Sequence, residues 1–91
     1  MYNAYLITYD LKQPVASYFL FFNEIRMASK WWHYLPNTWI IISEQTPTNW
    51  QTRLLSKTYI GDFFLIIQIK PYSDGFLPKD AWDWINANVP A

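Results

Sequence analysis

The stretch that decides the fold is Phe63-Phe64-Leu65-Ile66-Ile67-Gln68-Ile69-Lys70. This apolar run is rich in β-branched and aromatic residues and stops at Pro71, a pattern that predicts a β-strand. Successive side chains of a strand point to opposite faces of its sheet. Here both faces are apolar, whereas an antiparallel sheet with one solvated face alternates apolar with polar residues. We therefore expect both faces of the sheet around this strand to be covered.

Three further segments predict strands. Tyr2 to Tyr9 is rich in β-branched and aromatic residues, and Asp10 follows it as a polar exit. Trp31 to Leu35 and Thr38 to Ser43 form a second and third strand, joined by the turn dipeptide Pro36-Asn37. The central residues of Thr38 to Ser43 are again apolar on both faces.

A helix is predicted to begin at Gln13-Pro14, because proline suits the first turn of a helix. Apolar residues recur in it at spacings of three and four, which is typical of a helix with one buried face. We predict that this face consists of Val15, Tyr18 or Phe19, Phe22 and Ile25. The apolar residues outside this stripe are Leu20, Phe21 and Met27.

A second helix is predicted from Thr46-Pro47, an N-cap residue followed by proline at the first helical position. It should end before Gly61-Asp62, with Trp50, Leu54 and Thr58 along one side. A short terminal helix is predicted from Pro78 to Asn88, carrying Trp82 and Ile85.

This order of elements, βαββαβ and a terminal helix, predicts a ferredoxin-like α+β sandwich. We expect one domain, residues 1–91, with a four-stranded antiparallel sheet and two helices on one of its faces. Those helices leave the other face open. Because that face is also apolar, either the C-terminal segment or a second subunit should cover it, and a homodimer is expected.

Composition limits the classes of function. Aromatic residues make up 21% of the chain and charged residues only 15%, which excludes intrinsic disorder and favours exposed aromatic surface at an interface. The net charge of zero argues against non-specific nucleic-acid binding, which usually needs a basic domain. There is no cysteine and no apolar stretch long enough for a membrane span, and from Met1-Tyr2-Asn3-Ala4-Tyr5 we expect no secretory signal. We expect a cytoplasmic protein with no membrane partner.

Asp10 is the leading candidate for chemistry, because it ends a predicted central strand among apolar neighbours. If two copies paired through the open face, their Asp10 carboxylates could share Mg²⁺ or Mn²⁺, and such an ion activates water and stabilises phosphoryl charge. Lys12 could then steer a phosphate group. In the alternative interpretation, Asp10 accepts backbone hydrogen bonds or caps the turn into Pro14.

The other candidate groups favour structural roles. His33 is the only histidine, so one chain holds no catalytic histidine pair, and we expect a partly buried residue on a strand edge. Glu24 and Glu44 are predicted to be solvated. Four aromatic residues could stack unpaired bases but are expected to pack in a core or dimer interface. They are Trp31, Trp32, Tyr34 and Trp39.

The residues Tyr5-Leu6-Ile7-Thr8-Tyr9-Asp10-Leu11, with Trp31-Trp32-His33-Tyr34-Leu35 and Asn37-Thr38-Trp39-Ile40-Ile41, resemble a known family. It is the CRISPR-associated endoribonuclease-like superfamily, which includes virulence-associated protein D-type toxins, and more narrowly its SinR-family-like bacterial branch. The resemblance implies a ferredoxin fold, a dimer formed through the open sheet face, and a metal-binding aspartate at Asp10. It further implies metal-dependent nuclease activity on RNA or DNA, although some members of the superfamily are non-catalytic scaffolds. The alternative to a nuclease is therefore a dimeric interaction module in which Asp10 is structural.

Overall fold

The computed structural model describes all residues, 1–91, as an α+β fold built on one antiparallel sheet. The four strands are β1 (Asn3–Asp10), β2 (Lys30–Leu35), β3 (Thr38–Ser43) and β4 (Phe63–Ile69). They lie in the order β2-β3-β1-β4, so β1 is central and β4 is an edge strand. This arrangement confirms the predicted ferredoxin-like sandwich.

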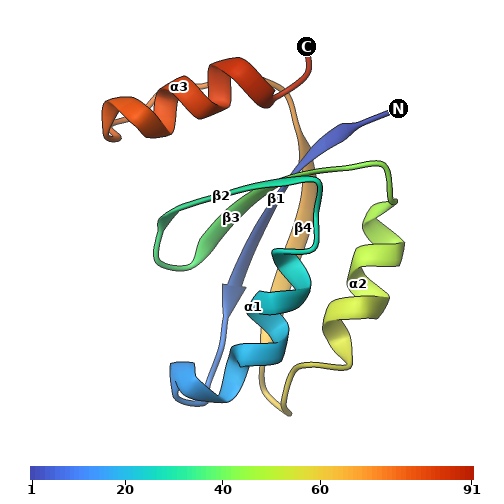
Figure 1. Cartoon of the computed structure of the whole chain (residues 1–91). Helices are drawn as coiled ribbons and strands as arrows, with labels where there is room; N and C mark the ends of the chain where they lie inside the picture. The colour runs from blue at the N-terminus through green and yellow to red at the C-terminus, as the bar shows by residue number, and fades with distance from the viewer.

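The first layer of helices packs on one face of the sheet (Figure 1). It contains a 3₁₀ turn, η1 (Val15–Tyr18), followed by α1 (Phe19–Ile25), and the antiparallel helix α2 (Pro47–Leu55). Their buried side chains form one hydrophobic cluster with the strand residues of that face. The cluster consists of Tyr5, Ile7, Tyr18, Phe21, Ile25, Trp39, Ile41, Trp50 and Leu54.

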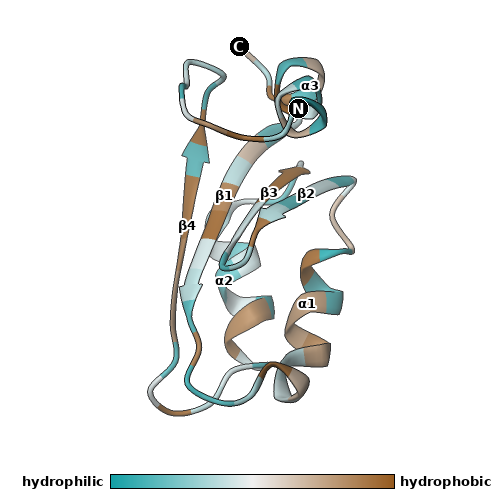
Figure 2. Cartoon of the chain, turned by 90° about the vertical axis from the view of Figure 1, so that its left-hand side faces the viewer, coloured by the Kyte–Doolittle hydropathy of each residue, from teal (hydrophilic) through white to brown (hydrophobic).

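The third helix, α3 (Lys79–Asn88), lies across one end of the opposite face (Figures 1 and 2). Ala81 and Ile85 pack there against Trp32 and Ile42 in a second buried cluster. The Trp32 indole N–H donates to the Ala81 carbonyl at 3.2 Å. The C-terminal segment therefore covers part of the face that α1 and α2 leave open.

The remainder of that face has no cover within the chain. We call it the bare half-face, and its β4 side chains Phe63, Leu65 and Ile67 are 70%, 53% and 49% exposed. Next to them, Leu6 and Thr8 of β1 pair with Ile67 and Leu65. Its members are thus Leu6, Thr8, Asp10, Phe63, Leu65 and Ile67. The C-terminal helix therefore provides part of the expected cover, and Phe63, Leu65 and Ile67 remain uncovered in the single chain.

The predicted apolar face of the first helix is confirmed at Tyr18 and Ile25, which are buried, and at Phe22, which packs against the same cluster. Phe21, placed outside the stripe, is fully buried, whereas Val15 and Phe19 are exposed. Val15 lies in η1, and a 3₁₀ turn has 3.0 residues per turn against 3.6 in an α-helix, so this residue departs from the α-helical stripe. Phe21 lies three residues after Tyr18 and four before Ile25, so it belongs to the same buried face.

The second helix begins as predicted, because the Thr46 hydroxyl accepts the Asn49 N–H at 3.0 Å and Pro47 occupies the first turn. It ends at Leu55, before Thr58. In the third helix the buried side chains are Ala81 and Ile85, while Trp82 is only partly buried. No helix has the length and apolar character needed to span a bilayer.

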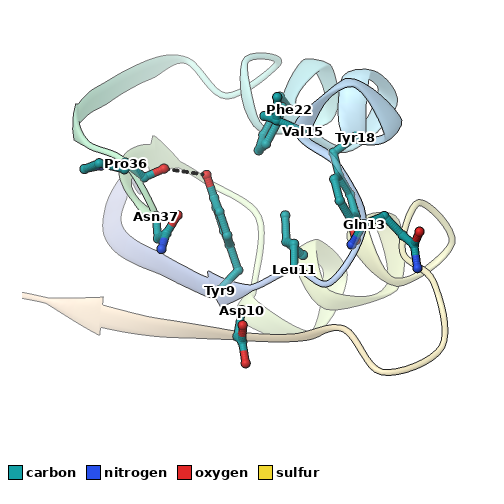
Figure 3. A pocket seen from close by; sticks show the side chains of 9 residues that line it. All are labelled: Tyr9, Asp10, Leu11, Gln13, Val15, Tyr18, Phe22, Pro36 and Asn37. Carbon is teal, nitrogen blue, oxygen red and sulfur yellow. Dashed lines mark hydrogen bonds between the residues drawn. The ribbon is translucent and has the colours of Figure 1, made fainter.

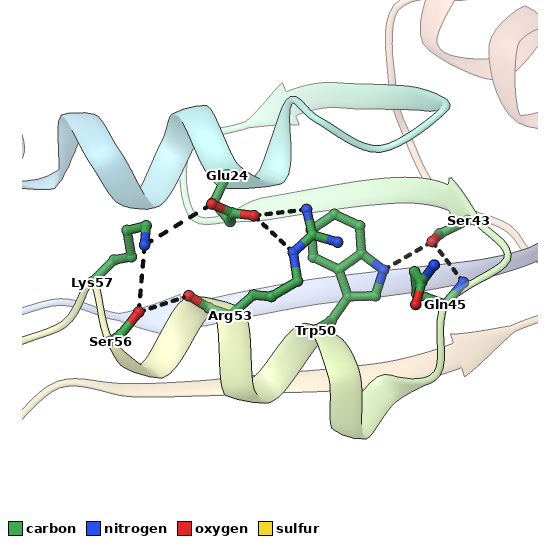
Figure 4. A network of polar contacts seen from close by, with 7 residues as sticks. All are labelled: Glu24, Ser43, Gln45, Trp50, Arg53, Ser56 and Lys57. Atoms are coloured by element: carbon green, nitrogen blue, oxygen red, sulfur yellow. Dashed lines mark hydrogen bonds and ion pairs between the residues drawn. The ribbon is translucent and has the colours of Figure 1, made fainter.

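Glu24 is not solvated as predicted, since its side chain is only 18% exposed. Its carboxylate accepts the Arg53 Nε–H at 2.7 Å and lies 4.0 Å from the Lys57 ammonium (Figure 4). The Arg53 guanidinium also lies 4.0 Å from the centre of the Trp50 ring. This network connects α1 to α2 and covers the buried indole.

Candidate functional site

Asp10 lies at the end of β1, opposite Phe63 of β4. Its position alternates with Thr8 and Leu6, so its side chain belongs to the bare half-face. The side chain is 67% exposed. In Figure 3 it points away from Tyr9, to the other side of the strand. The candidate carboxylate is therefore accessible and borders the uncovered apolar surface.

Lys12 lies beside it, with its ammonium nitrogen 2.6 Å from Asp10 Oδ2. The structure brings the predicted metal ligand and the predicted phosphate-steering residue together. Both side chains are more than half exposed, and such pairs contribute about 0–1 kcal/mol to stability. A cation that binds Asp10 would have to displace the Lys12 ammonium group.

One chain alone does not assemble a metal centre. No group of three acidic or histidine side chains lies close enough to hold a metal ion. Mg²⁺ retains several waters and is commonly held by one or two carboxylates together with substrate phosphates. Asp10 supplies one carboxylate, so the predicted Mg²⁺ or Mn²⁺ site needs a second carboxylate from another copy or oxygen ligands from a substrate.

Asp62, which no sequence pattern singles out, has the structural role suggested for Asp10. Its Oδ1 accepts the Lys12 backbone N–H, its Oδ2 accepts the Tyr59 N–H, and both oxygens lie 2.8 Å from the Tyr18 hydroxyl. These contacts join the β1–η1 loop to the α2–β4 loop. In the sequence, the only sign of this role is that Asp62 follows a glycine, which is common in turns. In the structure, Gly61 has a φ of +93°. The Asp10 side chain, in contrast, accepts no backbone hydrogen bond.

The hydrogen bonds to Asp62 set its pKa. Burial by itself would raise the pKa, but the N–H groups of Lys12 and Tyr59, the Tyr18 hydroxyl and the Lys12 charge together hold it below the usual value for aspartate. The carboxylate in turn acts on Tyr18. Burial and the neighbouring Asp62 raise the pKa of the Tyr18 hydroxyl, although the Gln13 N–H opposes them. The tyrosine therefore remains a hydrogen-bond donor.

We expect Asp62→Asn to destabilise the fold at neutral pH, because the amide removes the charge and one of the acceptor oxygens. The folded-state pKa lies below the unfolded value of about 4, so the stabilisation is present above that pH and is lost as pH falls through the folded-state pKa. The difference between the urea midpoints of unfolding of wild type and variant should therefore become smaller at acidic pH. Urea unfolding followed by circular dichroism from pH 7 to pH 2 measures it.

The matched control is Asp10→Asn, a nearby aspartate whose carboxylate accepts only the Lys12 ammonium. It should leave the urea midpoint at pH 7 almost unchanged. Equal losses in the two variants would contradict the role assigned to Asp62.

A small cavity of about 170 Å³ lies on the helix side of the β1 end (Figure 3). Tyr9 borders it, and its hydroxyl donates to the Pro36 carbonyl at 3.2 Å and accepts the Trp39 indole N–H at 3.0 Å. Burial raises the pKa of this hydroxyl, which stays protonated. Asp10 also lines this cavity, but in Figure 3 its carboxylate points to the other side of the strand from Tyr9.

The aromatic residues of β2 and β3 do not form one stacking platform. Trp31 and Trp39 face α1, whereas Trp32 lies under α3, and both Trp32 and Trp39 are buried. His33 is exposed, unlike the partly buried residue that the sequence predicts. Its ring stacks on Trp39 at 3.9 Å between centroids, and its Nδ1 lies 3.1 Å from the Thr38 carbonyl oxygen. The His33 ring therefore covers the buried Trp39 indole at the edge of the sheet.

No family model, curated protein or solved structure matches the chain.

Proposed function

We propose that this chain acts as a homodimeric interaction module, which self-associates through β4 and the bare half-face that β4 borders. The observation that supports this proposal is the exposure of Phe63, Leu65 and Ile67 on one sheet face. Contiguous exposed apolar surface of this kind is typical of interaction sites. Asp10 and Lys12 at its rim provide a polar boundary, as protein interfaces usually have.

Light scattering on a size-exclusion column tests the proposal directly. We expect a concentration-dependent species of twice the 10.9 kDa chain mass. A mass of one chain across the whole accessible concentration range would overturn it.

Metal-dependent cleavage of RNA or DNA is the second candidate function. Its support is that Asp10 is exposed, lies beside the proposed interface and serves no backbone hydrogen bond. The resemblance to the CRISPR-associated endoribonuclease-like superfamily implies the same residue. In this function, one Asp10 from each copy would hold Mg²⁺ or Mn²⁺, and Lys12 would contact the phosphate. That arrangement requires the two bare half-faces to meet so that the Asp10 side chains approach each other.

A cleavage assay separates the two candidates. Single-stranded RNA and duplex DNA are incubated at low salt with Mg²⁺, Mn²⁺ or EDTA, using wild type, Asp10→Ala and the control Asp83→Ala. Asp83 is an exposed aspartate of α3 paired with Lys79. Metal-dependent cleavage that only Asp10→Ala abolishes would establish the nuclease. Absence of cleavage from a dimeric wild type favours the interaction module.

A further inference from the structure

The free edge of β4 presents backbone hydrogen-bonding groups that no other segment uses. The Tyr9 N–H donates to the Asn37 carbonyl, so Tyr9 bonds toward β3. Bonding direction alternates along an antiparallel strand, and Ile7 and Tyr5 therefore also bond toward β3. In the β1–β4 register, Tyr9 lies opposite Phe64, Ile7 opposite Ile66, and Tyr5 opposite Gln68. The N–H and C=O groups of Phe64, Ile66 and Gln68 must then point outward.

The two edge strands, β2 and β4, differ in how well they are protected against pairing with another chain. Natural edge strands are blunted by charges, proline or bulges, which prevent pairing with another chain. β2 begins with Lys30, has a register irregularity between Trp32 and Leu35, and is followed by Pro36. β4 has no charge, no proline and an unbroken register with β1. In Figure 2 it forms the outer margin of the sheet, with its side away from β1 uncovered.

We propose that β4 pairs antiparallel with β4 of a second copy, about a twofold axis at Ile66. This inference rests on the proposed function and specifies its interface. Phe64 then pairs with Gln68 of the second copy and Ile66 with its own equivalent. All these residues carry outward-pointing groups, and each bonded pair exchanges two N–H···O bonds, about six in all.

Charge favours this register. Asp62 precedes β4 and Lys70 follows it, with only uncharged residues between them. Centring the axis on Ile66 places Asp62 opposite Lys70 of the second copy at both ends of the paired strands. The Asp62 carboxylate keeps its bonds to Lys12, Tyr59 and Tyr18, so the attraction is between two opposite charges near each other and not a direct ion pair. On the bare half-face it also places Leu65 opposite Ile67 and Phe63 opposite Ile69. If one β4 strand slides along the other to the next hydrogen-bonded register, fewer residues pair and the opposite charges move apart.

The resulting assembly is one continuous sheet with α1 and α2 of both copies on one side. The two bare half-faces lie next to each other on the other side, where Leu65 and Phe63 of one copy lie beside Ile67 and Ile69 of the other. Asp10 lies beside the Phe63 end of β4, and the twofold axis reverses that end in the second copy. The two Asp10 side chains are therefore far apart, so this interface opposes a metal shared between them.

The first test uses a matched pair at Gln68, which is exposed and makes one weak side-chain contact, to Asn3 at 3.4 Å. Gln68→Pro removes an outward N–H, and edge strands tolerate proline where the N–H faces solvent. Gln68→Ala shortens the side chain and keeps that N–H. We expect Gln68→Pro to raise the dimer dissociation constant about tenfold or more, and Gln68→Ala to change it little.

The second test concerns the charged ends. Lys70→Glu places like charges opposite each other at both ends, whereas Lys70→Gln only removes the attraction. We expect Lys70→Glu to weaken the dimer more than Lys70→Gln, with the difference shrinking at high salt. Equal weakening by the two variants would overturn the proposed register.

Disulfide trapping tests the geometry of the interface. The chain has no native cysteine, so every crosslink must join introduced cysteines. In the proposed register, Leu65→Cys mixed with Ile67→Cys should form a crosslinked heterodimer. Leu6→Cys alone should not crosslink, because β1 of one copy lies three strand spacings, about 14 Å, from β1 of the other. That separation exceeds the Cα distance of about 7 Å that a disulfide can bridge.

Each outcome has a distinct meaning. Rapid crosslinking of Leu6→Cys, or a Gln68→Pro variant as dimeric as Gln68→Ala, would overturn edge pairing and leave the homodimer intact in another arrangement. A wild type that stays monomeric would overturn both the homodimer and its interface. Circular dichroism of each variant verifies that the monomer remains folded.

Discussion

Trp50→Ala should lower the free energy of unfolding by about 3–5 kcal/mol, the usual cost of deleting a buried tryptophan side chain. Trp50 is fully buried in the cluster between the sheet and the α1–α2 layer. Its indole N–H donates to the Ser43 hydroxyl at 2.9 Å, and the Arg53 guanidinium covers its ring. The substitution thus leaves a large cavity and also removes the surface on which Arg53 rests.

The effect should be large relative to the whole fold, because domains have only about 5–15 kcal/mol of stability. Each kcal/mol corresponds to about 4–8 °C in Tm for a domain of this size, so we expect Tm to fall by at least about 12 °C. Thermal unfolding followed by far-ultraviolet circular dichroism measures the change.

Trp50→Phe is the matched control, since it keeps an aromatic ring in the core and loses the N–H donor. Its cost should be clearly smaller, because the Ser43 hydroxyl oxygen still accepts the Gln45 N–H at 3.0 Å. If Trp50→Phe were as destabilising as Trp50→Ala, the hydrogen bond rather than the packing would govern this site.

The fold could be predicted because its signals are local. The apolar run from Phe63, the turn at Pro36-Asn37 and the cap at Thr46 each depend on neighbouring residues, and the structure contains all three features. The exposure of Val15 could not be predicted from α-helical spacing, because this residue lies in a 3₁₀ turn, which has fewer residues per turn. Local patterns specify which elements form, whereas the burial of a residue at the end of a short helix depends on the local turn geometry.

In the candidate site, too, the sequence predicts contacts between nearby residues but not contacts between residues far apart in the chain. Asp10 and Lys12 are two residues apart in sequence, and their proximity followed from that spacing. The contacts of Asp62 with Lys12 and Tyr18 span 50 and 44 residues, and the contact of Glu24 with Arg53 spans 29. Carboxylates held by such long-range contacts have no signature in the sequence, because loop packing alone brings the groups together.

Ile85→Asp should detach α3 from the sheet. Ile85 is buried with Ala81 against β-strand residues such as Ile42, and a carboxylate there would enter an apolar cluster. Burying an unpaired charge costs several kcal/mol, so releasing the helix is the cheaper response. The α1–α2 layer packs in a separate cluster on the opposite face and should remain folded.

Hydrogen exchange measured by mass spectrometry distinguishes local release from global unfolding. In Ile85→Asp we expect rapid exchange in peptides covering residues 79–89, with protection retained in β1 and α2. The control Asn86→Asp introduces the same charge at the next, exposed position of the helix and should leave α3 protected. Protected α3 amides in Ile85→Asp would contradict the packing described for this helix. Release should also expose the apolar residues Trp32 and Ile42 beside the bare half-face, so this variant should bind a hydrophobic dye more strongly than Asn86→Asp does.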